Sequence, residues 1–91
     1  MASIDLSRNH SMGKAKAQRE ADKLAQDLAQ KFDFDYAWEN DVMHFERPGV
    51  NGTIEVRESS IRVCADLSLF LFALKPTVEN EIQRYLDKHF S

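Results

Sequence analysis

The sequence predicts an α+β fold in which an antiparallel sheet of four or five strands carries two helices packed on one face. Residues 34–69 place apolar side chains at every second position between short turn-rich segments, which is typical of an antiparallel meander. The flanking segments repeat apolar residues at steps of three and four, which indicates amphipathic helices. With a short alternating segment at the start, the predicted element order is β-α-β-β-β-β-α.

Residues 3–7 alternate apolar and polar side chains and predict a short first strand, whose place in the sheet the sequence leaves open. The first helix follows, with Ser11 as its expected N-cap. Its apolar stripe consists of Ala17, Ala21, Leu24, Leu28 and Phe32. The last helix begins near Pro76, a residue suited to a first turn. Its stripe consists of Val78, Ile82, Tyr85, Leu86 and Phe90.

The meander between the helices is predicted to have four strands. The first carries Tyr36 and Trp38 on one face, and the turn residues Asn40 and Asp41 end it. Residues 42–47 form the second strand, 48–52 a loop rich in turn formers, and 54–56 the third strand. A long fourth strand continues as far as Leu69. The expected core residues are Ile4, Leu6, Leu24, Leu28, Phe45, Ile54, Val63, Leu67 and Ile82.

A chain of 91 residues is expected to form a single domain, residues 1–91. Its composition, 43% hydrophobic and 30% charged, excludes a disordered or low-complexity protein. No apolar run is long enough to span a membrane, and the N-terminal residues show no secretory signal. The single cysteine excludes an internal disulfide. We therefore expect a cytoplasmic protein.

The charge distribution argues against a nucleic-acid partner. The net charge is −3, whereas binding to phosphates depends on positive charge. Residues 1–32 nevertheless carry six Lys and Arg against four acids. This excess is interpreted as a solvated helix face, the alternative being a weak patch for an anionic surface or an acidic partner.

The three histidines, His10, His44 and His89, fall in different predicted elements without metal-ligand spacing, so we expect no metal site. His10 lies just before a helix, where the positive end of the helix dipole favours a neutral imidazole. We interpret it as a local capping or packing residue, with a functional role as the alternative. Cys64 is predicted on the solvent face beside Arg62, which is expected to lower the thiol pKa modestly.

No catalytic constellation is visible. The sequence lacks a nucleophile motif and a phosphate-binding loop, and it has only three glycines. Asp33, Asp35 and Glu39 would share one strand face, which is interpreted as a solvated face rather than as a cation site. We therefore expect a protein that is not an enzyme and that needs no cofactor.

Residues 67–74 break the alternating pattern because they are apolar at nearly every position. If Leu67, Leu69 and Leu71 enter the core, Phe70 and Phe72 emerge on the opposite face. Alternatively, the chain leaves the sheet near Phe70 and buries both rings under the last helix. The first possibility predicts an exposed apolar patch, and hence a partner, a homodimer or an interfacial surface.

The chain resembles the small polyhydroxyalkanoic acid system family over essentially its whole length. The matching segments are His10-Ser11-Met12-Gly13, Tyr36-x-Trp38, Phe45-Glu46-Arg47, Gly49-Val50-x-Gly52, the Leu-rich run into Lys75-Pro76, and Ile82-x-x-x-Leu86-Asp87. Family members commonly have Leu where this chain has Met12. The resemblance implies a bacterial cytoplasmic protein, linked by gene neighbourhood to polyester storage. It implies no defined activity and no catalytic residues.

Two functions follow as hypotheses. The first is a non-enzymatic accessory or interaction protein of polyhydroxyalkanoate metabolism, associated with the granule surface or a protein partner through Phe70 and Phe72. The second is a small domain of reduced helix-grip type that binds an apolar or acyl ligand. Its groove would be lined by Trp38, Phe45 and the 70–72 region. An enzyme acting on hydroxyacyl substrates is disfavoured because no nucleophile with an acid–base pair is visible.

Overall fold

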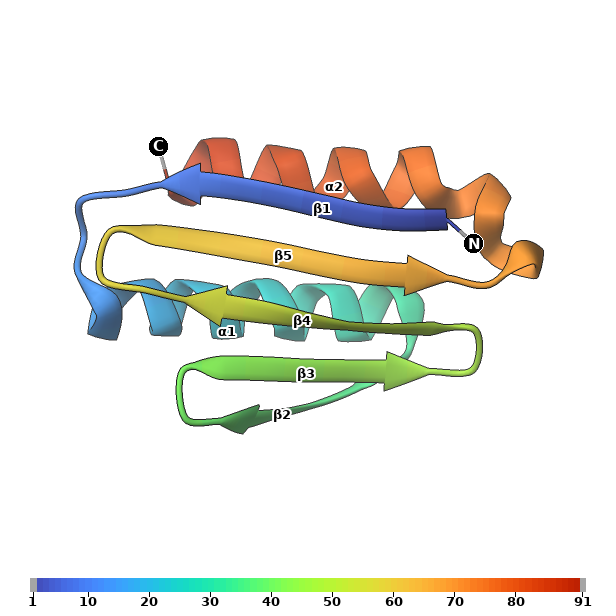
Figure 1. Ribbon diagram of the computed structural model, residues 1–91, viewed down its shortest axis with the longest axis horizontal. Coiled ribbons are helices and arrows are strands. Elements are labelled where there is room, and N and C mark those ends of the chain that lie inside the picture. Colours follow the sequence, from blue (N-terminus) through green and yellow to red (C-terminus); the bar gives the residue numbers. More distant parts are fainter. Residues whose placement is uncertain (1, 91) are drawn as a thin grey trace.

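The computed structural model describes residues 2–90 and confirms the predicted α+β class and element order. Figure 1 shows the arrangement of the elements. In chain order these are β1 (Ala2–Asn9), α1 (Lys14–Phe32), β2 (Asp35–Glu39), β3 (Val42–Arg47), β4 (Val50–Val56), β5 (Ser60–Leu67), the 3₁₀ helix η1 (Leu69–Leu74) and α2 (Lys75–His89).

Within residues 2–90 the sheet has five strands in the order β1-β5-β4-β3-β2, and every neighbouring pair is antiparallel. The meander from β2 to β5 leaves one edge of β5 free. β1 takes this edge, with Ile4 opposite Ala65 and Leu6 opposite Val63. The first strand, which the sequence did not place, is therefore an edge strand beside the last one (Figure 1).

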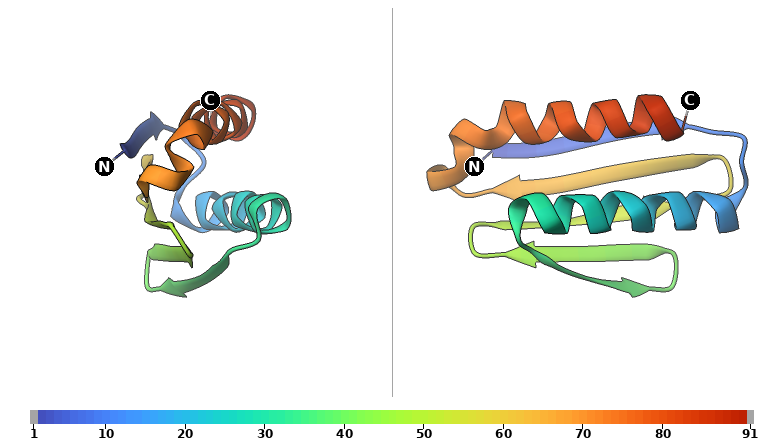
Figure 2. Two further views of the ribbon diagram at one scale, coloured as in Figure 1. Left: turned by 90° about the vertical axis from the view of Figure 1, so that its right-hand side faces the viewer. Right: turned by 180° about the vertical axis from the view of Figure 1, so that it is seen from behind.

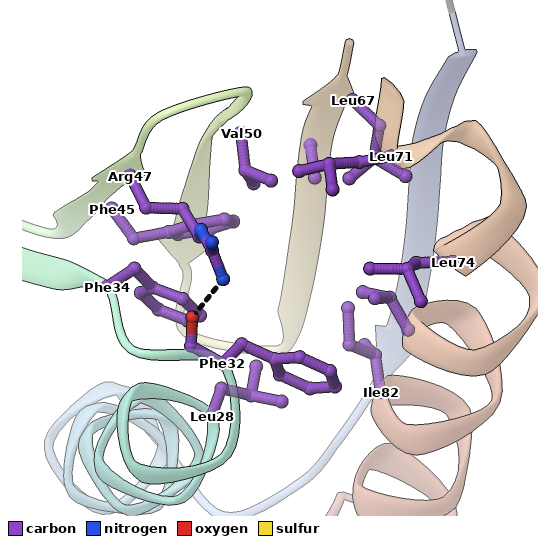
Figure 3. Close-up of a pocket in the computed structure, with 12 residues that line it drawn as sticks. Leu28, Phe32, Phe34, Phe45, Arg47, Val50, Leu67, Leu71, Leu74 and Ile82 are labelled. Carbon is purple, nitrogen blue, oxygen red and sulfur yellow. Dashed lines mark hydrogen bonds between the residues drawn. The ribbon is translucent and has the colours of Figure 1, made fainter. Parts of the chain in front are cut away.

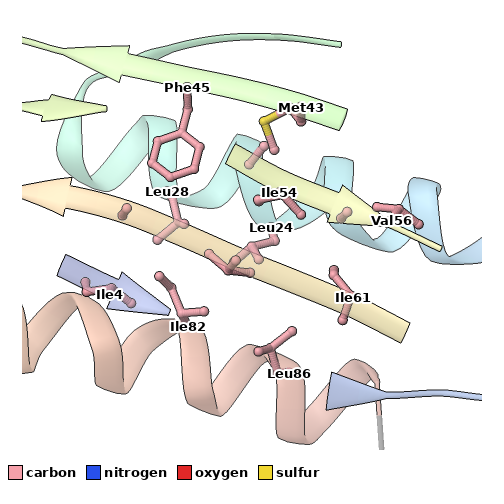
Figure 4. Packing of buried hydrophobic residues seen from close by; sticks show 14 of the residues in the cluster. Ile4, Leu24, Leu28, Met43, Phe45, Ile54, Val56, Ile61, Ile82 and Leu86 are labelled. Atoms are coloured by element: carbon pink, nitrogen blue, oxygen red, sulfur yellow. The ribbon is translucent and has the colours of Figure 1, made fainter. Parts of the chain in front are cut away.

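Both helices lie on the same face of the sheet, as predicted, and the opposite face is uncovered (Figure 2). The α1 helix packs over β4 and β2, whereas α2 packs over β1. Alternation along each strand directs apolar residues toward the helices, where they form one continuous core with the two helical stripes (Figure 4). Of the expected core residues, only Leu6 differs, because this residue is half-buried.

The start of α1 differs from the prediction. Gly13, not Ser11, is the N-cap residue, and no side chain caps this helix end. Gly13 has φ 81° and ψ 162°, a conformation that glycine adopts at little cost. The helix ends at Asp33, which has φ 56° and donates its backbone N–H to the Ala29 oxygen at 2.8 Å.

Two strand boundaries near one end of the sheet also differ. The predicted loop 48–52 is a tight Pro48-Gly49 turn, and β4 already begins at Val50. Gly49 has φ 88°, as the third residue of a type II turn requires. The β5 strand ends at Leu67, so the prediction that Leu69 belongs to this strand is wrong.

Substitution of a core leucine tests the helix packing. Leu24 is 1% exposed and Leu69 is 79% exposed. We expect Leu24→Ala to lower the free energy of unfolding by about 2–5 kcal/mol, because it leaves a cavity between α1 and the sheet. Leu69→Ala, the matched control, should change it by less than about 0.5 kcal/mol. Urea denaturation measures both values, and equal effects would contradict the packing described here.

Candidate functional site: an apolar end of the core

The η1 segment presents the exposed large hydrophobic side chains found in residues 2–90. Phe70 is 96% exposed and Phe72 54%, and Leu69 and Leu74 are exposed as well. The chain leaves the sheet before Phe70, as one of the two alternatives proposed, yet the rings are not buried under α2. A cluster of this kind on a small protein is typical of an interaction surface.

Contacts with the Pro48-Gly49 turn hold η1 against the end of the sheet. The Ser68 backbone N–H donates to the Gly49 oxygen at 2.8 Å, and the Leu71 N–H donates to the Ser68 oxygen at 3.0 Å. A Cβ atom on Gly49 would lie 3.0 Å from both Leu71 Cδ1 and Ser68 Oγ. Leu71 therefore packs onto the turn at the one place where no side chain intervenes, while Phe70 and Phe72 remain outside.

Beneath η1 lies a partly enclosed cavity of about 40 Å³, between the end of α1, the start of α2 and the sheet (Figure 3). Leu71 and Leu74 contribute to it from η1, and Val78 and Ile82 contribute from α2. The other lining residues are Leu28, Phe32, Phe34, Phe45, Arg47, Val50, Ala65 and Leu67. Every one of the twelve lining residues except Arg47 is apolar.

A glycine in the sheet makes room for an aromatic ring in the cavity wall. Phe45, Gly52 and Ala65 stand opposite one another in one row across β3, β4 and β5. A Cβ atom on Gly52 would lie 2.5 Å from Cζ of Phe45, so the ring occupies the place of the missing side chain. Phe34 packs against the same ring, with centroids 5.2 Å apart. Phe34, Phe45 and Ala65 together line the cavity on this side.

Arg47 is the polar exception in the cavity. It follows Met43 and Phe45 at steps of two, so it projects from the core face of β3. The Arg47 Nη1 group donates a hydrogen bond to the Phe32 oxygen at the end of α1 (Figure 3). Its Nε atom is buried and has no hydrogen-bond partner among residues 2–90. This nitrogen is enclosed by protein atoms, so the surface that the cavity presents is apolar.

The structure does not unite the residues predicted to line one ligand groove. Phe45 lines the cavity, whereas Phe70 and Phe72 face outward beside it. Trp38 lies further along the sheet and donates from Nε1 to the Asp22 carboxylate on α1 at 2.9 Å. The cavity lies between two helices rather than beneath a single long one.

His10 lies at the other end of the sheet from η1, after β1 ends, and it is buried. Its Nδ1 atom accepts the Met12 backbone N–H at 3.3 Å, and its ring meets Phe90 edge-on with centroids 5.8 Å apart. Its Nε2 atom has no partner in the described residues. His10 therefore makes local packing contacts, but it does not cap α1, because no side chain bonds to that helix end.

The uncovered sheet face carries polar pairs. Arg62 forms two hydrogen bonds with Asp5, at 3.0 and 2.7 Å, and these bonds lower the pKa of the Asp5 carboxyl. Burial and the nearby Asp5 raise the pKa of the Cys64 thiol, and they outweigh Arg62, which lowers this pKa as expected. Between residues 2 and 90, no three His, Cys, Asp or Glu side chains gather as metal ligands would. Neither helix of this range is long and apolar enough to cross a membrane.

Comparison with known proteins gives one result. The family model described as "Putative polyhydroxyalkanoic acid system protein" matches residues 4–90. The chain belongs to the polyhydroxyalkanoic acid system protein family. No curated protein and no solved structure matches the chain. The exposed rings and the apolar cavity adjoin each other at one end of the fold.

Sequence reasoning found Phe70 and Phe72 but missed the cavity and Arg47. One signal for Arg47 was present, since it continues the alternation of Met43 and Phe45 and so places a charge on the core face. Leu71 was directed toward the core by one of the two alternatives for residues 67–74, whereas no signal singled out Leu74. The direction of both side chains depends on the 3₁₀ geometry of η1, which the run of apolar residues does not specify.

A tyrosine between the helices gives a pH prediction. The Tyr85 hydroxyl donates to the Glu20 backbone oxygen at 3.2 Å, and burial raises its pKa from 10.0 to about 12. Since only the unfolded chain ionises this phenol between these values, the contribution of Tyr85 to stability is fully present below pH 10 and is lost as the pH rises toward 12. Tyr85→Phe should remove this part of the loss in urea titrations at pH 9–12.

The absorbance of tyrosinate provides an independent measurement. In the Tyr36→Phe variant Tyr85 is the remaining tyrosine of the two in the chain. Its titration midpoint should lie near 12, as in the intact protein. A midpoint at 10.0 would contradict the burial of this side chain.

Proposed function

We propose that this protein is a non-enzymatic accessory protein of polyhydroxyalkanoate metabolism that docks on the surface of the polymer granule through η1. The observation that carries the proposal is the exposure of Phe70 and Phe72 on a segment that the Pro48-Gly49 turn holds in place. Membership of the polyhydroxyalkanoic acid system family supports the choice of a polyester as the partner.

The chemistry of the surface agrees with that of the polymer. A polyhydroxyalkanoate presents aliphatic groups and ester oxygens, and it has no charge along its chain. The η1 segment, Leu69–Leu74, is likewise uncharged and apolar throughout. Such a pair associates by removing apolar area from water, without desolvating charged groups.

The magnitude suits a reversible contact. Two exposed aromatic rings remove roughly 300 Å² from water when a surface covers them. At about 25 cal/mol per Å² this corresponds to about 7.5 kcal/mol before the cost of association. That cost is itself about 4–15 kcal/mol, so one molecule binds weakly and reversibly.

The proposal predicts that Phe70→Ser with Phe72→Ser reduces binding to particles of poly(3-hydroxybutyrate) by at least tenfold, because the apolar contact area is lost. The measurement is co-sedimentation of purified protein with the particles. The matched control is Phe70→Leu with Phe72→Leu, which keeps most of the apolar area and should bind nearly as the unaltered protein does.

The folded state of each variant is checked by thermal unfolding. Both rings are exposed, so neither pair of substitutions should lower the melting temperature appreciably. Undiminished binding by a folded serine variant would refute the docking surface. Loss of a homodimer in that variant, with unchanged particle binding, would assign the rings to self-association instead.

A further inference from the structure

The cavity beneath η1 has the position, size and chemistry of a receptor for part of the polymer. Phe70 and Phe72 face outward, while Leu71 and Leu74 of the same segment line the cavity. Leu71, Val50 and Val78 are only half-buried, so the lining reaches the protein surface next to the rings. A polymer surface bound by Phe70 and Phe72 therefore lies beside an opening into the core.

The volume limits what can enter. A water-sized group needs about 10–15 Å³ of such space, so about 40 Å³ holds about three groups of this size. This corresponds to an alkyl chain of about three carbons. A long acyl chain does not fit unless η1 moves, because pockets for whole ligands are several times larger.

The lining specifies the kind of group. Eleven of its twelve residues are apolar, which favours an alkyl chain. The Nε of Arg47 is enclosed by protein, so it adds no hydrogen-bonding group to this surface. The alkyl side group of a hydroxyalkanoate unit complements this arrangement, because it is uncharged and neither donates nor accepts hydrogen bonds.

We propose that the cavity binds the alkyl side group of one hydroxyalkanoate unit, preferably of about three carbons. This inference rests on the proposed docking of η1 on the polyester, and it adds a preference for the side group. Leu71 and Val78 form the walls around the alkyl chain.

The test uses soluble esters that imitate one internal unit of the polymer and carry no donor. Methyl 3-acetoxyhexanoate has a propyl side group, and methyl 3-acetoxybutanoate has a methyl group. Binding is followed by NMR shifts of the Leu71, Val50 and Val78 methyl groups. The propyl ester should bind roughly tenfold tighter, because two further methylene groups are buried.

Two variants fill the cavity from opposite sides. Ala65→Val extends the side chain from the sheet and Val78→Ile from α2, and the two residues line the same space. Each folded variant should bind both esters about equally, so that the preference for propyl is lost. Because the fillings come from different elements, one variant remains informative if the other fails to fold.

The outcomes separate this inference from the proposed function. The Phe70→Ser, Phe72→Ser variant should still prefer the propyl ester although it fails to bind particles. Ala65→Val should still bind poly(3-hydroxybutyrate) particles through the rings. Equal binding of both esters by the unaltered protein, or an undiminished propyl preference in both filled variants, would overturn the inference and leave particle docking intact.

Discussion

The structure depends on one constraint, which is that the apolar face of a five-stranded sheet must be covered by two helices. Alternation along each strand sends half of the side chains to this face, and they become stable only when water is excluded from them. The two helices cover β4, β2 and β1. Where α1 ends and α2 has not begun, neither helix covers the sheet, and η1 occupies that end (Figure 2).

The η1 segment therefore covers the end of the core with some of its side chains and exposes others. Leu71 closes the core by packing onto Gly49, where the positive φ and the absence of a Cβ allow close approach. With about three residues per turn, a 3₁₀ helix cannot turn all six apolar side chains inward, so Phe70 remains in solvent. The rings of Phe70 and Phe72 are exposed because η1 covers the end of the core with only some of its side chains. Because this cover is incomplete, a cavity remains beneath η1.

The apolar end carries the exposed large hydrophobic side chains of the described residues. His10 packs against Phe90 and accepts the Met12 N–H, and the Asp5–Arg62 pair lies on the uncovered sheet face. At the apolar end, by contrast, the rings of Phe70 and Phe72 lack a cover.

The sequence by itself determined the fold class, the helical stripes and the side of each strand that enters the core. These features follow from periodicity, which residues such as Leu24, Met43 and Ile82 display over several turns or strand positions. It did not determine the place of β1, the end of β5 or the direction of Leu71. These depend on which edge is free, where the helices stop and how closely the Gly49 turn approaches. Such facts arise from contacts between distant residues, so only the tertiary structure decided them.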